Sequence, residues 1–133
     1  MTGTGRGGGP RETAYDTVIV GGAVMGSSLA YWLSENPDYD GTVLVVEMDS
    51  TYERASTTLS EASVRHQFSE PVNIRLSMFA TEFIAEFHQH VQVDGESPDL
   101  GFRDTGYLFL ATDDGMDVLR ENHEAQRSCG AEV

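Results

Sequence analysis

The sequence predicts an α/β fold built on a parallel sheet, and three features near the amino terminus carry this prediction. Residues 16–20 have the pattern of a short buried strand, residues 21–26 form a glycine-rich turn, and residues 24–35 have the pattern of an apolar helix. A second apolar strand is expected at residues 42–47, and it ends in an acid. This order of elements is typical of a Rossmann-like fold that binds FAD or NAD(P) on a parallel sheet with helices.

The glycine-rich turn is the candidate pyrophosphate site. The first glycine permits a tight turn out of the strand, and the last one lets the helix pack close to the sheet. The first backbone N–H groups of the helix have no partner within it, and the helix dipole favours a negative charge there. An alanine replaces the middle glycine of the G-x-G-x-x-G fingerprint, and a glycine turn without a ligand is the alternative interpretation. The candidate cofactor-binding residues are Gly21, Gly22, Ala23, Val24, Met25 and Gly26.

Glu47 is the candidate ribose-binding residue. It follows Gly26 by 21 positions (47 − 26), close to the roughly 20 that separate the turn from the ribose-binding acid in such folds. A carboxylate there accepts hydrogen bonds from ribose hydroxyls and repels a 2′-phosphate, so FAD or NAD is favoured over NADP.

Composition excludes several classes of function. The formal net charge is −14, and all eight basic residues are arginines, which argues against nucleic-acid binding and against an anionic membrane surface. The apolar stretch at residues 18–33 is shorter than the roughly 20 residues that span a bilayer, so no transmembrane segment is expected. Cys129 is the only cysteine, which leaves no internal disulfide and no cysteine metal site, and we assign no metal ligand. We expect a cytoplasmic location.

The rest of the chain is predicted from periodicity and turn chemistry. Residues 1–14 have the composition of a disordered tail, residues 48–70 form a polar, hydroxyl-rich connection, and residues 71–91 have the spacing of one amphipathic helix with Ser69 as its N-cap. Long polar loops in compact domains are often functional.

The last forty residues are predicted to form a loop, a strand and a helix. We expect the loop at residues 93–104 and the strand at residues 105–111. The helix is predicted to be capped by Asp113 or Asp114 and to run to about Cys129, with Gly130 closing it. Residues 131–133 have the pattern of the first residues of a further strand, so we expect the chain to be a fragment of a longer protein.

Beyond these patterns, several stretches resemble one flavoprotein family. The motif Arg54-Ala55-Ser56-Thr57, Ser60, the run Arg65-His66-Gln67-Phe68-Ser69 and residues 101–112, taken with the turn and Glu47, resemble the amino-terminal part of the DAO-type FAD-dependent oxidoreductases. That family includes D-amino-acid, glycine and sarcosine oxidases and dimethylglycine dehydrogenases. The likeness is strongest to its FAD-dependent oxidoreductase domain-containing branch, whose members are much longer than this chain.

The resemblance implies FAD as cofactor and a role for each matching residue. The glycine turn would hold the pyrophosphate and Glu47 the ribose. Ser56, Thr57 and Ser60 would contact phosphate or the ribityl chain, and Arg65, the one candidate catalytic residue, would lie near the isoalloxazine and a substrate carboxylate. We interpret His66 as a loop residue rather than a base.

The resemblance also implies a division into domains and one departure from the family. Residues 15–92 would form the FAD-binding portion, and residues 93–133 would start the sheet of a second, substrate-binding domain that is truncated here. Where the family often has two glycines before the arginine loop, this chain has Ala62 and Ser63.

The implied function is an FAD-dependent oxidase or dehydrogenase that oxidises the C–N bond of an amino acid or an N-methylated amine, with that small molecule as its partner. An NAD-dependent dehydrogenase of the same fold class and a non-catalytic fragment are the alternatives. The hydroxyl-rich connection after Glu47 favours FAD, because an extended flavin needs contacts beyond the second strand. We expect the isolated chain to be inactive.

Overall fold

The computed structural model describes residues 12–133, so most of the predicted tail at residues 1–14 lies outside the described residues. The chain divides into two compact units, residues 1–62 and residues 63–133, which are described separately here. The predicted domain boundary between residues 92 and 93 stays a prediction.

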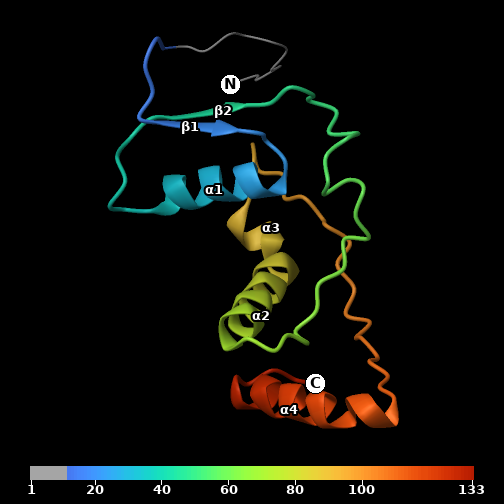
Figure 1. The fold of residues 1–133 in the computed structure, drawn as a ribbon. Coiled ribbons are helices and arrows are strands. Elements are labelled where there is room, and N and C mark those ends of the chain that lie inside the picture. The colour runs from blue at the N-terminus through green and yellow to red at the C-terminus, as the bar shows by residue number, and fades with distance from the viewer. Residues whose placement is uncertain (1–11) are drawn as a thin grey trace. The chain divides into compact units, whose positions relative to one another are not determined.

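The first unit contains the predicted strand–helix–strand order. β1 (Thr17–Val20) pairs in parallel with β2 (Val43–Val46), and α1 (Val24–Glu35) is the crossover between them. The register aligns Thr17 with Val43 and Val20 with Val46. Figure 1 shows α1 running along one face of this sheet. Parallel strands need such a crossover, so the predicted α/β, Rossmann-like fold is confirmed, with each strand slightly shorter than expected.

Asp16 and Thr42 fix the register at the start of both strands. The Asp16 carboxylate accepts hydrogen bonds from the Thr42 backbone N–H at 2.7 Å and from its hydroxyl at 2.9 Å. The Thr17 N–H then donates to the Thr42 carbonyl at 3.0 Å. These bonds, the Thr42 backbone bond first, lower the pKa of Asp16. The Asp16 carboxylate is therefore ionised at neutral pH, and we call this pair of residues, Asp16 and Thr42, the clamp.

One face of the sheet is covered and the other carries exposed valines. Ile19 is buried and its neighbours Val18 and Val20 are exposed, because successive side chains of a strand point to opposite faces. Ile19 lies on the side of α1, where its Cγ2 is 3.1 Å from the position that a Cβ on Gly26 would occupy.

The amphipathic segment of the second unit forms two helices where one was predicted. α2 (Pro71–Ala85) is followed by the single turn of α3 (Phe87–His90), so the prediction of one helix over residues 71–91 is wrong. At Glu86 the backbone leaves helical geometry (φ −101°, ψ 14°), and the next bond, from the Gln89 N–H to the Glu86 carbonyl at 2.8 Å, spans three residues.

The predicted cap Ser69 is also wrong. Proline is favoured as the first residue of a helix, so with Pro71 there the N-cap is Glu70, which makes no side-chain capping bond.

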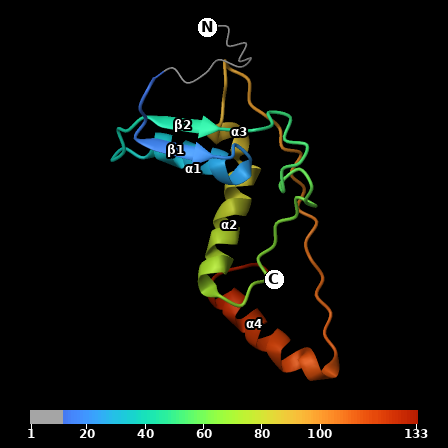
Figure 2. The same ribbon diagram turned by 45° about the horizontal axis from the view of Figure 1, so that its top comes forward.

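The last helix packs near the start of α2, as Figure 2 shows. A 3₁₀ turn at Asp113–Gly115 leads into α4 (Met116–Ser128). The buried Gln126 side chain donates to the Phe68 carbonyl at 3.1 Å, which ties the helix to the loop before α2. Gly130, at φ +88°, closes the helix as predicted. The predicted caps Asp113 and Asp114 are wrong, because they lie within the 3₁₀ turn and Gly115 is the N-cap.

The strand predicted at residues 105–111 is absent from the described residues, and so is the one predicted from residue 131. The chain between α3 and the 3₁₀ turn is extended (Figure 2), with one β-bridge between Val93 and Glu96. A strand needs a neighbour for its backbone groups, and within residues 12–133 none pairs with this segment. Within the described residues the predicted start of a second-domain sheet has no paired strand, and the division into domains stays a prediction. No helix in the described part of the chain is long and apolar enough to cross a membrane.

Candidate functional site

The turn between β1 and α1 brings the helix start against the end of the strand. Gly21 adopts φ +100°, in the left-handed region that favours glycine, while its N–H bonds the Val46 carbonyl at 2.8 Å. A Cβ on Gly26 would lie only 1.8 Å from the Gly21 carbonyl oxygen. The two glycines thus have the geometry predicted for a tight turn and for close packing of helix and strand.

Glu47 lies at the end of β2 and reaches across to this turn. Its Oε2 accepts a hydrogen bond of 2.6 Å from the Gly22 N–H, and its Oε1 accepts one of 2.8 Å from the Asp49 N–H. These bonds, that of Asp49 first, lower the pKa of Glu47. An ionised acid therefore lies beside the glycine turn, at the carboxyl ends of the parallel strands, where such folds bind ligands.

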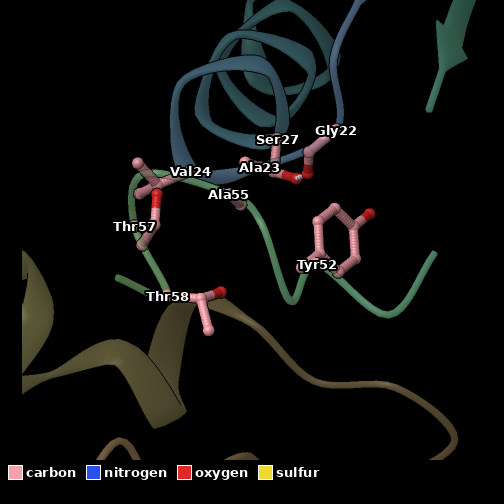
Figure 3. A pocket seen from close by; sticks show the side chains of 8 residues that line it. All are labelled: Gly22, Ala23, Val24, Ser27, Tyr52, Ala55, Thr57 and Thr58. Carbon is pink, nitrogen blue, oxygen red and sulfur yellow. Dashed lines mark hydrogen bonds between the residues drawn. The ribbon is translucent and has the colours of Figure 1, made fainter. Parts of the chain in front are cut away.

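A hollow of about 360 Å³ opens beside the turn (Figure 3). One wall is the start of α1 and the other is the connection after β2. Its volume falls within the roughly 300–1,000 Å³ typical of small-molecule sites. The lining residues are Gly22, Ala23, Val24, Ser27, Tyr52, Ala55, Thr57 and Thr58.

Four of these lining residues were missed in the sequence. Ser27 donates its hydroxyl to the Gly22 carbonyl (Figure 3), which holds the turn against the helix. Ala55 and Thr58 flank the predicted Ser56 and Thr57, so the motif pointed to their segment but not to their side chains. Nothing in the sequence singled out Tyr52, because it reaches the hollow only through the way the connection after β2 folds.

Six of the predicted cofactor-binding residues do not line the hollow, namely Gly21, Met25, Gly26, Glu47, Ser56 and Ser60. Met25 is 82% exposed, and Ser56 is exposed as well. Ser60 serves its own turn: its hydroxyl donates to the Thr57 carbonyl at 2.8 Å and accepts from the Ala62 N–H at 3.1 Å. Contacts of all the predicted site residues with the cofactor stay predictions.

Arg65 belongs to the second unit, where two aromatic rings hold its side chain. Its guanidinium carbon lies 5.2 Å from the centre of the Phe68 ring and 5.7 Å from that of Phe109. Both distances fall within the roughly 6 Å of a cation–π interaction. The cation is exposed, so its N–H donors can reach an anion. Its predicted position near the flavin stays a prediction.

His66, next to Arg65, anchors the loop that carries both residues to α2. Its Nε2 lies 3.0 Å from the Thr81 hydroxyl oxygen, and that hydroxyl donates to the Ser77 carbonyl at 2.9 Å. This contact fits the interpretation of His66 as a loop residue.

Comparison with known proteins decides the family. A family model described as "FAD dependent oxidoreductase" matches residues 16–133, nearly the whole chain. The chain belongs to the FAD-dependent oxidoreductase family. No solved structure matches it.

Curated relatives in this family are similar along most of the chain. "FAD-dependent oxidoreductase domain-containing protein 1" of Xenopus laevis is 48% identical over 93% of this chain, and the Bos taurus protein of that name is 46% identical over 89%. The Drosophila melanogaster homolog is 38% identical over 90%. The chain spans about a quarter of the length of these relatives (25%, 25% and 23%).

FAD is the cofactor of this family, and the residues around the hollow fit its ADP half. The start of α1 would offer backbone N–H groups to a pyrophosphate, and the ionised Glu47 would suit ribose hydroxyls. The family match decides for FAD over NAD, a choice that the turn and the acid alone had left open.

Proposed function

We propose that this chain forms the FAD-binding part of an oxidoreductase that oxidises the C–N bond of an amino acid or an N-methylated amine. The observation that carries the proposal is the hydrogen bond between Glu47 and Gly22 at the edge of the hollow. It sets a ribose acceptor and a phosphate-binding turn side by side.

The residues of this chain bind and orient the cofactor. The N–H groups at the start of α1 hold the pyrophosphate, the Glu47 carboxylate accepts the ribose hydroxyls, and the Thr57 and Thr58 hydroxyls line the opposite wall. Bound FAD supplies the two-electron oxidation of the carbon next to nitrogen. The positions of these binding groups determine how the flavin ring is oriented toward the substrate.

The substrate class is proposed from Arg65. A guanidinium that lies over the rings of Phe68 and Phe109 has fewer accessible rotamers than a free arginine. Such a cation suits a planar carboxylate, which it can bind through two hydrogen bonds. Amino acids and N-methylated amino acids both carry that group.

A chimera tests the substrate class. Residues 16–133 replace the matching quarter of the Xenopus laevis relative, and flavin reduction is followed by absorbance without oxygen. Amino acids and N-methylated amino acids are compared with amines that lack a carboxylate. We expect bleaching with the carboxylated substrates and a large rise in their KM in Arg65→Gln, with Arg103→Gln as the control. Equal reduction by carboxylate-free amines, or no effect of Arg65→Gln, would refute the assignment of Arg65 to a substrate carboxylate. It would leave the oxidation of N-methylated amines as the proposed activity.

The 133-residue chain by itself is proposed to bind FAD without oxidising these substrates. Flavin reduction in this chain at the rate of the chimera would show that the catalytic unit is complete within it. A chimera that binds FAD but reduces it with no substrate of the panel would favour the non-catalytic alternative.

A further inference from the structure

Tyr52 has an unusual backbone conformation at the edge of the hollow. Its φ is +57°, in the left-handed region that residues other than glycine rarely adopt. Two turn bonds of 3.0 Å hold it there, from its N–H to the Asp49 carbonyl and from the Ala55 N–H to its own carbonyl. Strained residues of this kind persist where the surrounding structure imposes them, often at ligand sites.

This conformation turns the phenol toward the glycine turn. Figure 3 shows the ring of Tyr52 across the hollow from the start of α1, close to Gly22. Its hydroxyl oxygen lies 2.9 Å from the point that a Cβ on Gly22 would occupy, and the Cβ of Glu47 lies 3.4 Å from the same point. The hydroxyl and the acid thus meet in the space that the missing side chain of Gly22 leaves.

The hydroxyl is available to a ligand. Tyr52 is 36% exposed, and within residues 12–133 the hydrogen bonds of this residue are those of its backbone. A phenol can both donate and accept. The neighbouring Ser27 hydroxyl is engaged with the Gly22 carbonyl. The Glu47 carboxylate accepts one bond on each oxygen, from Gly22 and from Asp49, and keeps further lone pairs for ribose hydroxyls.

We propose that Tyr52 is a positioning residue for the adenosine half of FAD, and that its hydroxyl hydrogen-bonds the nucleotide beside Glu47. The assignment rests on the proposed function, since it takes the hollow as the FAD site. It also gives Gly22 a second role: this position lacks a side chain because the phenol and the acid fill that space.

Binding of FAD and of its two parts, ADP and riboflavin, to the purified 133-residue chain tests the proposal. Tyr52→Phe keeps the ring and removes the hydroxyl. The dissociation constants for FAD and for ADP should both rise about fivefold, the usual effect of one lost hydrogen bond, while that for riboflavin stays the same. Tyr15→Phe is the matched control, because the Tyr15 hydroxyl bonds the Glu12 N–H and does not line the hollow. Thermal unfolding of the free protein should be unchanged in both variants.

The outcomes separate this proposal from the proposed function. If the wild type binds FAD and ADP and Tyr52→Phe binds them equally well, the role of Tyr52 is refuted while the site stands. An equal loss for riboflavin and ADP would also refute it, because a merely structural residue would weaken both. If the wild type binds neither FAD nor ADP, the proposed function itself fails.

A double-mutant cycle tests the link to Gly22. A Cβ in Gly22→Ala would meet the mobile end of the Tyr52 side chain, so we expect it to displace the phenol and weaken ADP binding about as much as Tyr52→Phe does. In the Tyr52→Phe background the same alanine should add less than a twofold loss. If the loss of ADP affinity in the double variant equals the product of the two single losses, the link between Gly22 and Tyr52 is refuted. Gly22 would then act on the ligand directly.

Discussion

The Gly22 backbone N–H and the Glu47 carboxylate are joined by a hydrogen bond of 2.6 Å. It connects the turn after β1 to the end of β2 and fixes the orientation of the acid. An acid already oriented and ionised binds ribose hydroxyls without first losing side-chain freedom. The glycine turn and the proposed ribose acceptor are therefore held together as one preorganised group.

Gly26→Ala should destabilise the first unit and abolish its site. The added Cβ would lie 1.8 Å from the Gly21 carbonyl oxygen. Because this oxygen belongs to the backbone, it cannot move aside as the tip of a flexible side chain can. We expect a loss of about 2–3 kcal/mol in the free energy of unfolding, as for severe overpacking. Urea unfolding measures it. Gly115→Ala is the control, because its Cβ would meet only ordinary contacts at 3.6 Å; equal stability of the two variants would contradict the close packing.

The first unit should lose stability in acid because of its hydrogen-bonded carboxylates. Backbone and hydroxyl donors lower the pKa values of Asp16, Glu47 and Asp49. A carboxylate with a lowered pKa stabilises the fold above its unfolded pKa and loses that effect as the pH falls through the folded value, here below about pH 4. Unfolding followed between pH 6 and pH 2 should show this loss, and Asp16→Asn should be less stable at pH 6 but less acid-sensitive. An unchanged pH profile in Asp16→Asn would show that the clamp does not contribute.

Ala62→Gly should stabilise the protein. Ala62 has φ +50°, a conformation that costs an L-residue about 1–2 kcal/mol. The greater freedom of glycine in the unfolded chain offsets about 0.5–1 kcal/mol of that, so we expect a net gain of about 0.5 kcal/mol in urea unfolding. Ala55→Gly, at a residue outside the left-handed region, should be destabilising. A loss of stability in Ala62→Gly would contradict the left-handed backbone.

The neutral His66 ring should carry its proton on Nε2. The Thr81 hydroxyl already donates to the Ser77 carbonyl, so it can only accept from the ring nitrogen 3.0 Å away. Long-range ¹H–¹⁵N spectra above pH 8 should show Nε2 protonated and Nδ1 bare, and Thr81→Val should remove this preference. A proton on Nδ1 in the wild type would rule out the anchoring bond.

The sequence predicted what depends on neighbouring residues and missed what depends on distant ones. The boundaries of α1 were predicted residue for residue, and both strands to within one residue at each end, because apolar runs and glycines encode them locally. Tyr52 and Ser27 were missed as lining residues, since the turns after Asp49 and the packing of the helix start place them. The strand expected at residues 105–111 has an alternating pattern, but a strand also needs a partner that no local pattern supplies.

Ala62, where the family often has a glycine, shows the same limit of prediction from local sequence. The sequence marked it as a missing family glycine, and only the backbone reveals that this position is left-handed. Likewise, the spacing placed Glu47 near the turn, but only the structure shows that Gly22 and Asp49 already hold its carboxylate.

Binding of FAD to the purified 133-residue chain, wild type against Glu47→Ala, tests the central claim most directly. Quenching of flavin fluorescence gives both dissociation constants, and Glu35→Ala, at the far end of α1, is the control. We predict that the wild type binds FAD and that Glu47→Ala weakens binding about 10- to 150-fold, the range for hydrogen bonds to a charged group, with Glu35→Ala unchanged. Equal affinity of the wild type and Glu47→Ala, or a wild type that does not bind FAD, would contradict the account.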